Sequence, residues 1–351
     1  MIRAVSRGLI EAGYRVSVLA SDPRTLEAFA AAGLATIVCH HFGRPIRPLR
    51  DLRAVAETVA VCRRHEVDLL HTHTSKGGAV GRVASRWLGL PVVHTVHGYP
   101  FHEFCRPVQR AVFRLVERAL APMATRLVFI SKDDFRYALA RRWCRAARCW
   151  YIPNGVPIPP LPQPVPDHGG RPLLITVGRL SLQKGYPVLL RAFARLLADY
   201  PEARLWFVGD GEQRRELERL AQEMALLSSV EFLGFQEQPL EWLARAHLAV
   251  SPSLWEGLPI AVLEMMSARR PIVATSCRGT RDLLRDGVDA VLAPPGDAPA
   301  LAEAMRAVLA DWARARAMAD NARERVESLY SEKLMVSRYL RLFDELTSSK
   351  G

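Results

Sequence analysis

The chain has 351 residues, 49% hydrophobic and 24% charged, which is enough to bury more than one hydrophobic core, so two domains are expected. The net charge of +12 is uneven, because residues 1–150 carry 24 Lys and Arg against 11 Asp and Glu, a balance of +13. A basic half suits an anionic membrane surface or an acidic substrate. No nucleic-acid partner is expected, because zinc-finger spacing, glycine–aromatic RNA-binding signatures and basic heptads are all missing from the sequence.

Neither a membrane-spanning segment nor a signal peptide is expected, because no apolar run approaches about 18 residues and the first residues lack a central apolar block. The six cysteines show no Cys-x-x-Cys pair and no metal-ligand spacing with histidine, so we expect reduced thiols. These features predict a cytoplasmic protein whose membrane contact is peripheral, on the inner face of the cell membrane.

The first half alternates short apolar runs with amphipathic segments. A helix is expected over residues 3–13, followed by strands at 15–20, 67–71, 91–97 and 126–130. This alternation is typical of a parallel α/β sheet, in which ligand-binding residues lie at the carboxyl ends of the strands. The polar residues at those ends are His71, His73, His97 and Ser131.

Residues 151–157 are followed by a Pro- and Gly-rich stretch over residues 158–172 that continues neither a helix nor a central strand, so the domain boundary is expected there. We therefore expect domains over residues 1–155 and 156–330, with a final helical segment over 331–351. The strands expected in the second domain are 173–177, 204–208, 230–232, 248–250, 271–274 and 290–292. They predict a second doubly wound sheet.

Residues 251–267 place Glu256 and Glu264 eight positions apart around a turn that opens an apolar helix. Eight helical positions span roughly 12 Å, near the distance from a ribose to a sugar across a diphosphate. Gly257 and Leu258 lie between the carboxylates, where the unpaired amide groups of a helix start favour an anion. This predicts a nucleotide-sugar site, although Ser253 and Glu256 also fit an ordinary capping box, with Glu264 as a solvated helix residue.

A second candidate element follows the apolar run 173–177, where Gly178, Arg179 and Lys184 enter one loop. An Arg fork and a Lys point charge can bind the oxygens of a departing diphosphate. Either cation alone is more often a surface charge.

The motifs occur in order: Gly178-Arg179 to Lys184-Gly185, Gly209-Asp210-Gly211, Phe232-Leu233-Gly234, and Pro252-Ser253 through Glu256-Gly257-Leu258-Pro259 to Glu264. This order resembles family 4 of the retaining, nucleotide-sugar-dependent glycosyltransferases, over nearly the whole chain. Residues 68–78 and 91–99 are similar to transferases that build capsular polysaccharides and lipid-linked oligosaccharides. The resemblance implies a GT-B fold, with two doubly wound Rossmann-like domains facing across a cleft, the nucleotide on the second, and a last helix crossing back to the first.

The resemblance also implies roles for individual residues. His97, Arg179, Lys184 and Glu256 are the expected catalytic residues, with both cations on the leaving diphosphate and Glu256 at the donor sugar. Glu264 is expected to bind ribose hydroxyls. The remaining expected donor contacts are Gly178, Leu233, Gly257 and Leu258, with Phe235 beside Leu233 in a base pocket unless Leu233 is plain core. The acceptor-side candidates are His73, Ser75 and Lys76.

The resemblance implies a UDP sugar as co-substrate, a lipid-linked or capsular glycan as acceptor, and neither a metal nor another cofactor. Two basic segments are candidates for docking on an anionic membrane. Residues 106–120 carry Arg110, Arg114 and Arg118 on one helical face, and residues 136–150 carry five arginines among Tyr137, Trp143 and Trp150. A solvated helix face explains such charge runs equally well.

Members of the resembled family usually begin with a strand and a glycine-rich loop, whereas this sequence starts directly with a helix, so the first strand is expected to be missing. Either the start has been assigned too late, or the chain is a truncated remnant that binds nucleotide sugar without turnover. A nucleotide-sugar epimerase of the same fold is a further alternative. It needs additional acid–base carboxylates in the first domain, where the loop ends carry histidines instead. The sequence does not indicate an oligomeric state.

Overall fold

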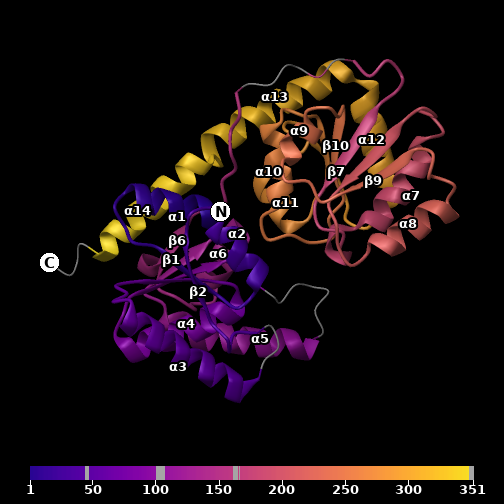
Figure 1. The fold of residues 1–351 in the computed structure, drawn as a ribbon. Coiled ribbons are helices and arrows are strands. Elements are labelled where there is room, and N and C mark those ends of the chain that lie inside the picture. The colour runs from indigo at the N-terminus through magenta and orange to yellow at the C-terminus, as the bar shows by residue number, and fades with distance from the viewer. Residues whose placement is uncertain (44–46, 100–106, 161–164, 166, 348–351) are drawn as a thin grey trace. The chain divides into compact units, whose positions relative to one another are not determined.

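The computed structural model describes residues 1–43, 47–99, 107–160, 165 and 167–347. The chain divides into two compact units, of which the first comprises Met1–Asn154 and Glu332–Gly351 and the second comprises Gly155–Ser331. The last helix, α14 (Glu332–Thr347), therefore belongs to the first unit, although it follows the second in sequence (Figure 1).

The first unit holds two separate parallel sheets. β1 (Ser17–Ala20) pairs with β2 (Ala35–Val38), and the larger sheet has the order β3 (Leu70–His73), β4 (Val92–Val96), β5 (Arg126–Phe129), β6 (Cys149–Tyr151). Every residue of β4 is buried, as expected for a parallel strand with helices on both faces. Along the described chain α1 (Ile2–Glu11) comes first, and β1 is the first strand.

The helices of the first unit cover both sides of the sheets. They are α1, α2 (Pro23–Ala30), α3 (Pro48–Arg64), α4 (Ser75–Leu88), α5 (Pro107–Leu120), α6 (Lys132–Ala140) and α14, with 3-10 turns η1 (Ala121–Met123) and η2 (Ala146–Arg148). Val5 of α1 and Tyr339 of α14 pack with Val93 of β4 and Val128 of β5 in one core cluster. The terminal helix is therefore part of the core that supports the carboxyl ends of these strands.

The second unit is built on one six-stranded parallel sheet. Its order is β12 (Val291–Ala293), β11 (Ile272–Thr275), β10 (Leu248–Ser251), β7 (Leu173–Val177), β8 (Arg204–Val208), β9 (Val230–Gly234). The strand order reverses between β7 and β10, and ligands of doubly wound sheets bind outside the carboxyl ends at such a switch point. The loops after β7 and β10 are therefore the first place to look for a site.

Helices flank this sheet and enclose a large apolar core. They are α7 (Tyr186–Leu196), α8 (Arg214–Glu223), α9 (Pro239–Leu243), α10 (Ile260–Ser267), α11 (Arg278–Leu283), α12 (Ala298–Ala310) and α13 (Trp312–Leu329), with the 3-10 turn η3 (Leu182–Lys184). Leu189 and Phe193 of α7 and Leu301 and Met305 of α12 are fully buried in the main cluster. Both units are thus parallel α/β bodies, consistent with the two Rossmann-like domains that the sequence predicts.

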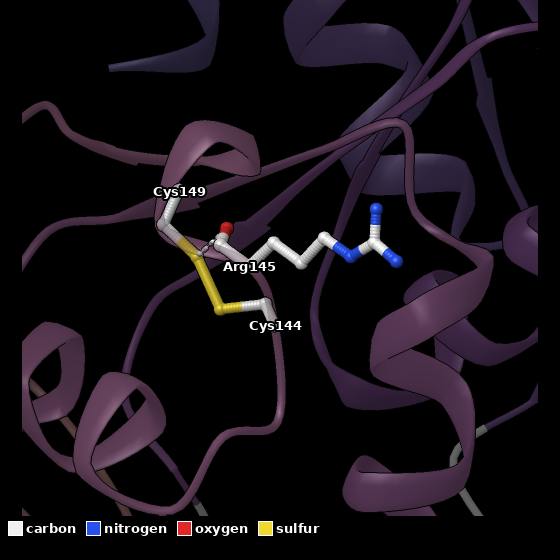
Figure 2. Close-up of a disulfide and its surroundings, with 3 residues drawn as sticks. All are labelled: Cys144, Arg145 and Cys149. Carbon is white, nitrogen blue, oxygen red and sulfur yellow. Dashed lines mark hydrogen bonds between the residues drawn. A yellow bond between two sulfur atoms is a disulfide. The ribbon is translucent and has the colours of Figure 1, made fainter.

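Cys144 and Cys149 are joined in a disulfide, with Arg145 between them in the chain (Figure 2). The expectation of reduced thiols is therefore wrong for this pair. The chain turns through η2 and brings the two Cα atoms to 6.9 Å, a proximity that a five-residue spacing alone does not reveal. Cys39, Cys62 and Cys277 are buried free thiols. Within the described ranges, no helix is both long and apolar enough to cross a membrane.

Candidate functional site

One close glycine contact and one backbone hydrogen bond hold the loop after β7 against the loop after β10. Gly185 has a φ of +65°, and a Cβ there would lie 2.2 Å from the Pro252 carbonyl oxygen. The backbone N–H of Leu254 donates to the Gln183 carbonyl at 2.8 Å, which joins the same two loops. Only glycine combines this positive φ with so close a backbone approach. The sequence therefore delivers η3, and with it Lys184, to the residues that follow β10.

Lys184 and Glu256 form the centre of this site. The Lys184 Nζ lies 2.6 Å from the Glu256 Oε1, and the two side chains are only 17% and 7% exposed. Ser253 Oγ donates to Glu256 Oε1 at 2.8 Å, and Gln183 Nε2 donates to Glu256 Oε2 at 3.0 Å and to the Trp255 carbonyl at 2.9 Å. Three donors from two loops therefore fix the Glu256 carboxylate, and Ser253 and Gln183 are contributors that the sequence did not single out in this role.

The helix between the two glutamates begins later than predicted. α10 starts at Ile260 with Pro259 as its N-cap residue, so Glu256 lies in the preceding loop and Glu264 lies within the helix. The capping-box interpretation is wrong, because Ser253 bonds the Glu256 side chain rather than a helical N–H. The estimate of a helical rise over all eight positions is wrong for the same reason. Pro259 is the signal in the sequence, since proline favours the start of a helix.

Glu264 is mostly buried beside this pair. Burial raises its pKa from 4.5 to about 7, and the positive charge of Lys184 lowers it in part. Among the described residues, no side-chain hydrogen bond occupies the Glu264 carboxyl. A carboxylate held in this way can accept two vicinal hydroxyl groups of a ribose.

The other donor-side candidates lie in different environments. Arg179 pairs with Glu212 at 3.0 Å, and both side chains are exposed. Leu258 is buried in the loop before α10, and Leu233 is half-buried on β9. The structure therefore brings Lys184, Glu256 and Glu264 together, whereas Arg179 has a different partner.

Two further glycines allow close packing around the same loops. At Gly178, where φ is +147°, a Cβ would lie 2.9 Å from the Tyr186 hydroxyl oxygen. At Gly279, a Cβ would come within 2.5 Å of the Gly257 carbonyl oxygen and 3.0 Å of that of Glu256. Gly279 is a supporting residue that sequence reasoning missed, because its neighbour lies more than twenty positions earlier in the chain.

The first unit gathers histidines at the carboxyl ends of β3 and β4. His73 is the last residue of β3, His97 directly follows β4, and His73 Nδ1 lies 3.0 Å from His97 Nε2. His71 Nε2 lies 2.8 Å from the Thr95 Oγ1, which in turn lies 3.0 Å from the hydroxyl of Tyr339 on α14. Two expected site residues, His73 and His97, are therefore in direct contact.

These imidazoles are neutral at pH 7. Burial lowers the pKa of His97 to about 4 and that of His71 to about 3, and it holds the pKa of His73 well below its usual value. A neutral imidazole can donate one hydrogen bond and accept another, so the contact with His73 uses only one of the two ring nitrogens of His97.

Ser75 and Lys76 begin α4, directly after the Thr74 N-cap, which has a φ of +62°. The Lys76 Nζ lies 2.7 Å from Asp51 Oδ1 of α3. Lys76 therefore joins two helices of the first unit. In the part of the chain that the structure describes, no group of three or more His, Cys, Asp or Glu side chains is placed to hold a metal ion.

The chain has two Rossmann-like units, and in the second the loops after β7 and β10 bring Lys184 and Glu256 together where the strand order reverses. This arrangement is that of the GT-B class of glycosyltransferases. The fold agrees with sucrose-phosphate synthase from Thermosynechococcus elongatus at a TM-score of 0.83 and 25% identity, covering 99% of this chain and 93% of that one. It also agrees with HepE of Anabaena, solved in complex with UDP, at a TM-score of 0.80 and 21% identity, covering 98% and 96%.

Family models and relatives identify the class further. Residues 1–155 match the glycosyl transferase 4-like domain, and residues 160–325 match glycosyl transferases group 1. An Escherichia coli UDP-Gal:alpha-D-GlcNAc-diphosphoundecaprenol alpha-1,3-galactosyltransferase is 26% identical over 322 residues, 88% of this chain and 83% of its own. The putative glycosyltransferase EpsD of Bacillus subtilis is 31% identical over 267 residues, 72% and 68%. The chain belongs to the family 4 type of GT-B glycosyltransferases, which act on nucleotide sugars.

Proposed function

We propose that this glycosyltransferase transfers a sugar from a UDP sugar to a lipid-linked or capsular glycan, with retention of the anomeric configuration and without a metal ion. The bond between the sugar C1 and the diphosphate oxygen breaks, and a bond from C1 to the acceptor oxygen forms on the same face. The acceptor proton passes to the departing diphosphate, so the products are the extended glycan and UDP.

The observation that carries this proposal is the cluster of Lys184, Glu256 and Glu264 around the switch point of the second unit. Lys184 supplies a buried positive charge at 2.6 Å from Glu256, and a fixed cation stabilises the negative charge that grows on a leaving diphosphate. Glu264 accepts the ribose hydroxyls, and Glu256 contacts the donor sugar. Gly178, Leu233, Gly257 and Leu258 line the donor site, and Arg179 exchanges its exposed partner Glu212 for the phosphate.

On the acceptor side, His97 contacts the reacting sugar through the ring nitrogen that His73 does not occupy, and Ser75 and Lys76 lie at the start of the neighbouring helix. The name of the E. coli relative, whose acceptor is a diphosphoundecaprenol glycan, supports a lipid-linked acceptor for this chain too. With such an acceptor, we place the enzyme at the inner face of the cell membrane as a peripheral protein.

The first experiment is calorimetric titration with UDP and with GDP, followed by transfer assays with UDP sugars and a polyprenyl-diphosphate glycan. We expect UDP to bind in preference to GDP, Glu264→Ala to abolish that binding, and turnover to persist in EDTA. The control Glu216→Ala changes an exposed glutamate on α8 of the same unit. Binding of UDP without transfer to any glycan would instead support the non-catalytic alternative, and a divalent-metal requirement would contradict the proposed chemistry.

A further inference from the structure

Helix α5 (Pro107–Leu120; labelled in Figure 1) exposes a row of large apolar side chains. Val108, Val112, Leu115 and Val116 follow helical spacing, so they share one side. All four are exposed, Val108 to 75% and Leu115 to 68%. In a soluble domain the apolar side of a helix normally faces the core. Helix α5 therefore exposes its apolar side to solvent, the opposite of the usual arrangement.

Polar contacts anchor the opposite side of α5. Glu117 is buried, and its Oε2 accepts a hydrogen bond at 3.2 Å from Arg82, which lies fully buried on α4. Arg82 also donates from Nε to the Gly78 carbonyl at 2.8 Å. Phe113 packs against the cluster that contains Phe129. Turning the apolar side inward would leave the Arg82 charge buried without its partner, which is costly, so the fold itself holds the valines and Leu115 in solvent.

One exposed arginine lies on α5 itself, and another contacts the turn that follows it. Arg118 is exposed on α5, and Nη1 of Arg148 donates to the carbonyl of Pro122, directly after α5. The predicted docking segment 136–150 contributes charge rather than apolar contact, because Tyr137 and Trp143 pack against each other in a core cluster while its five arginines are exposed. Arg106, at the start of the other predicted segment, lies outside the described residues.

We propose that α5 docks the protein on an anionic lipid bilayer. The four apolar side chains enter the interfacial region, and Arg118 and Arg148 bind lipid phosphates. A contiguous exposed apolar patch marks an interaction surface, and a helix with one apolar side and nearby arginines lies in the plane of a membrane interface. The surplus positive charge of residues 1–150 attracts anionic headgroups. This inference rests on the proposed membrane-borne acceptor for its biological purpose.

The test is cosedimentation with phosphatidylcholine vesicles that contain or lack phosphatidylglycerol. We expect the wild-type protein to bind only the anionic vesicles, and the double variant Val112→Ser/Leu115→Ser to bind them about tenfold more weakly, since it removes two inserted side chains. Leu227→Ser is the matched control, because Leu227 is an exposed leucine in the second unit. Arg118→Gln is expected to weaken binding at low salt.

Two results would overturn the inference. One is equal vesicle binding by the double variant and the wild type. The other is a wild-type dimer in the absence of lipid that the double variant converts to a monomer, which would assign the face to a second copy of the chain. Titration with UDP on the same samples separates this question from the proposed function. Vesicle binding without UDP binding supports docking and contradicts the proposed function, and UDP binding without vesicle binding does the reverse.

Discussion

Replacing Glu264 by glutamine is expected to stabilise the protein at alkaline pH and to damage its nucleotide site. Burial raises the pKa of Glu264 from 4.5 to about 7. Between these values the unfolded chain binds fewer protons at this position than the folded chain. Stability therefore falls as the pH rises from about 4.5 to about 7, and the full penalty persists above that range.

The size of the penalty follows from the shift. A difference of about 2.5 pKa units corresponds to about 3 kcal/mol at 1.36 kcal/mol per unit. Glutamine keeps the shape of the side chain and cannot ionise, so Glu264→Gln is expected to gain up to about 3 kcal/mol at pH 8 and under about 1 kcal/mol at pH 5. Urea unfolding at both pH values measures the difference. Glu216→Gln, a substitution at an exposed position on α8, is the control.

The same titration predicts the pH dependence of donor binding. If the ionised Glu264 carboxylate accepts the ribose hydroxyls, the affinity of the wild type for UDP rises about tenfold per pH unit below 7 and becomes constant above it. In Glu264→Gln the affinity is weak and loses the pH dependence that this carboxyl contributes. Equal stability of variant and wild type at pH 8, together with a UDP affinity that is constant between pH 6 and 8, would refute a raised pKa at Glu264.

Three further substitutions test the remaining contacts. Lys184→Met is expected to lower kcat about a hundredfold with a smaller change in KM, because it removes the charge at the leaving group. Steady-state assays of UDP release measure both constants. A change in KM alone would contradict the proposed role of Lys184. Gly279→Ala places a Cβ within 2.5 Å of the Gly257 carbonyl oxygen, so calorimetry should show UDP affinity reduced about tenfold or more as the loop with Glu256 shifts. His73→Leu is expected to lower kcat about tenfold. His73→Asn is expected to keep part of the lost activity, because an amide nitrogen can replace Nδ1 in the hydrogen bond to His97. Equal values of kcat in the two variants would show that this hydrogen bond does not matter.

The alternation of strands and helices was predictable because each strand carries its own apolar run. The proximity of Lys184, Glu256 and Glu264 was predictable because their types and order match the motifs of the family. The start of α10 at Ile260 was missed, although Pro259 marks it. For the strands and for Pro259 the information lies within a few residues of the feature, whereas the three charged residues came from the resemblance to the family.

The features that could not be predicted from the sequence depend on contacts with other parts of the chain. The amphipathic pattern of α5 shows two sides but not which side is covered, and Arg82, the residue that decides it, lies 35 positions before Glu117. Arg179 was grouped with Lys184 in one loop, yet its partner is Glu212 from the next loop. Cys144 and Cys149 required knowledge of the turn at η2. Long-range pairing thus determines which polar groups remain for function.

The positive charge of Lys184 already has a partner within the protein. Its ammonium is paired with a Glu256 carboxylate that two further donors hold in place, so a diphosphate that recruits Lys184 must compete with this contact. Ground-state binding then gains little from Lys184, because one ionic partner is exchanged for another. As the bond to the sugar breaks, negative charge grows on the leaving oxygen while the charge of Glu256 stays constant. The gain is therefore concentrated in the transition state, where it raises kcat rather than tightening substrate binding.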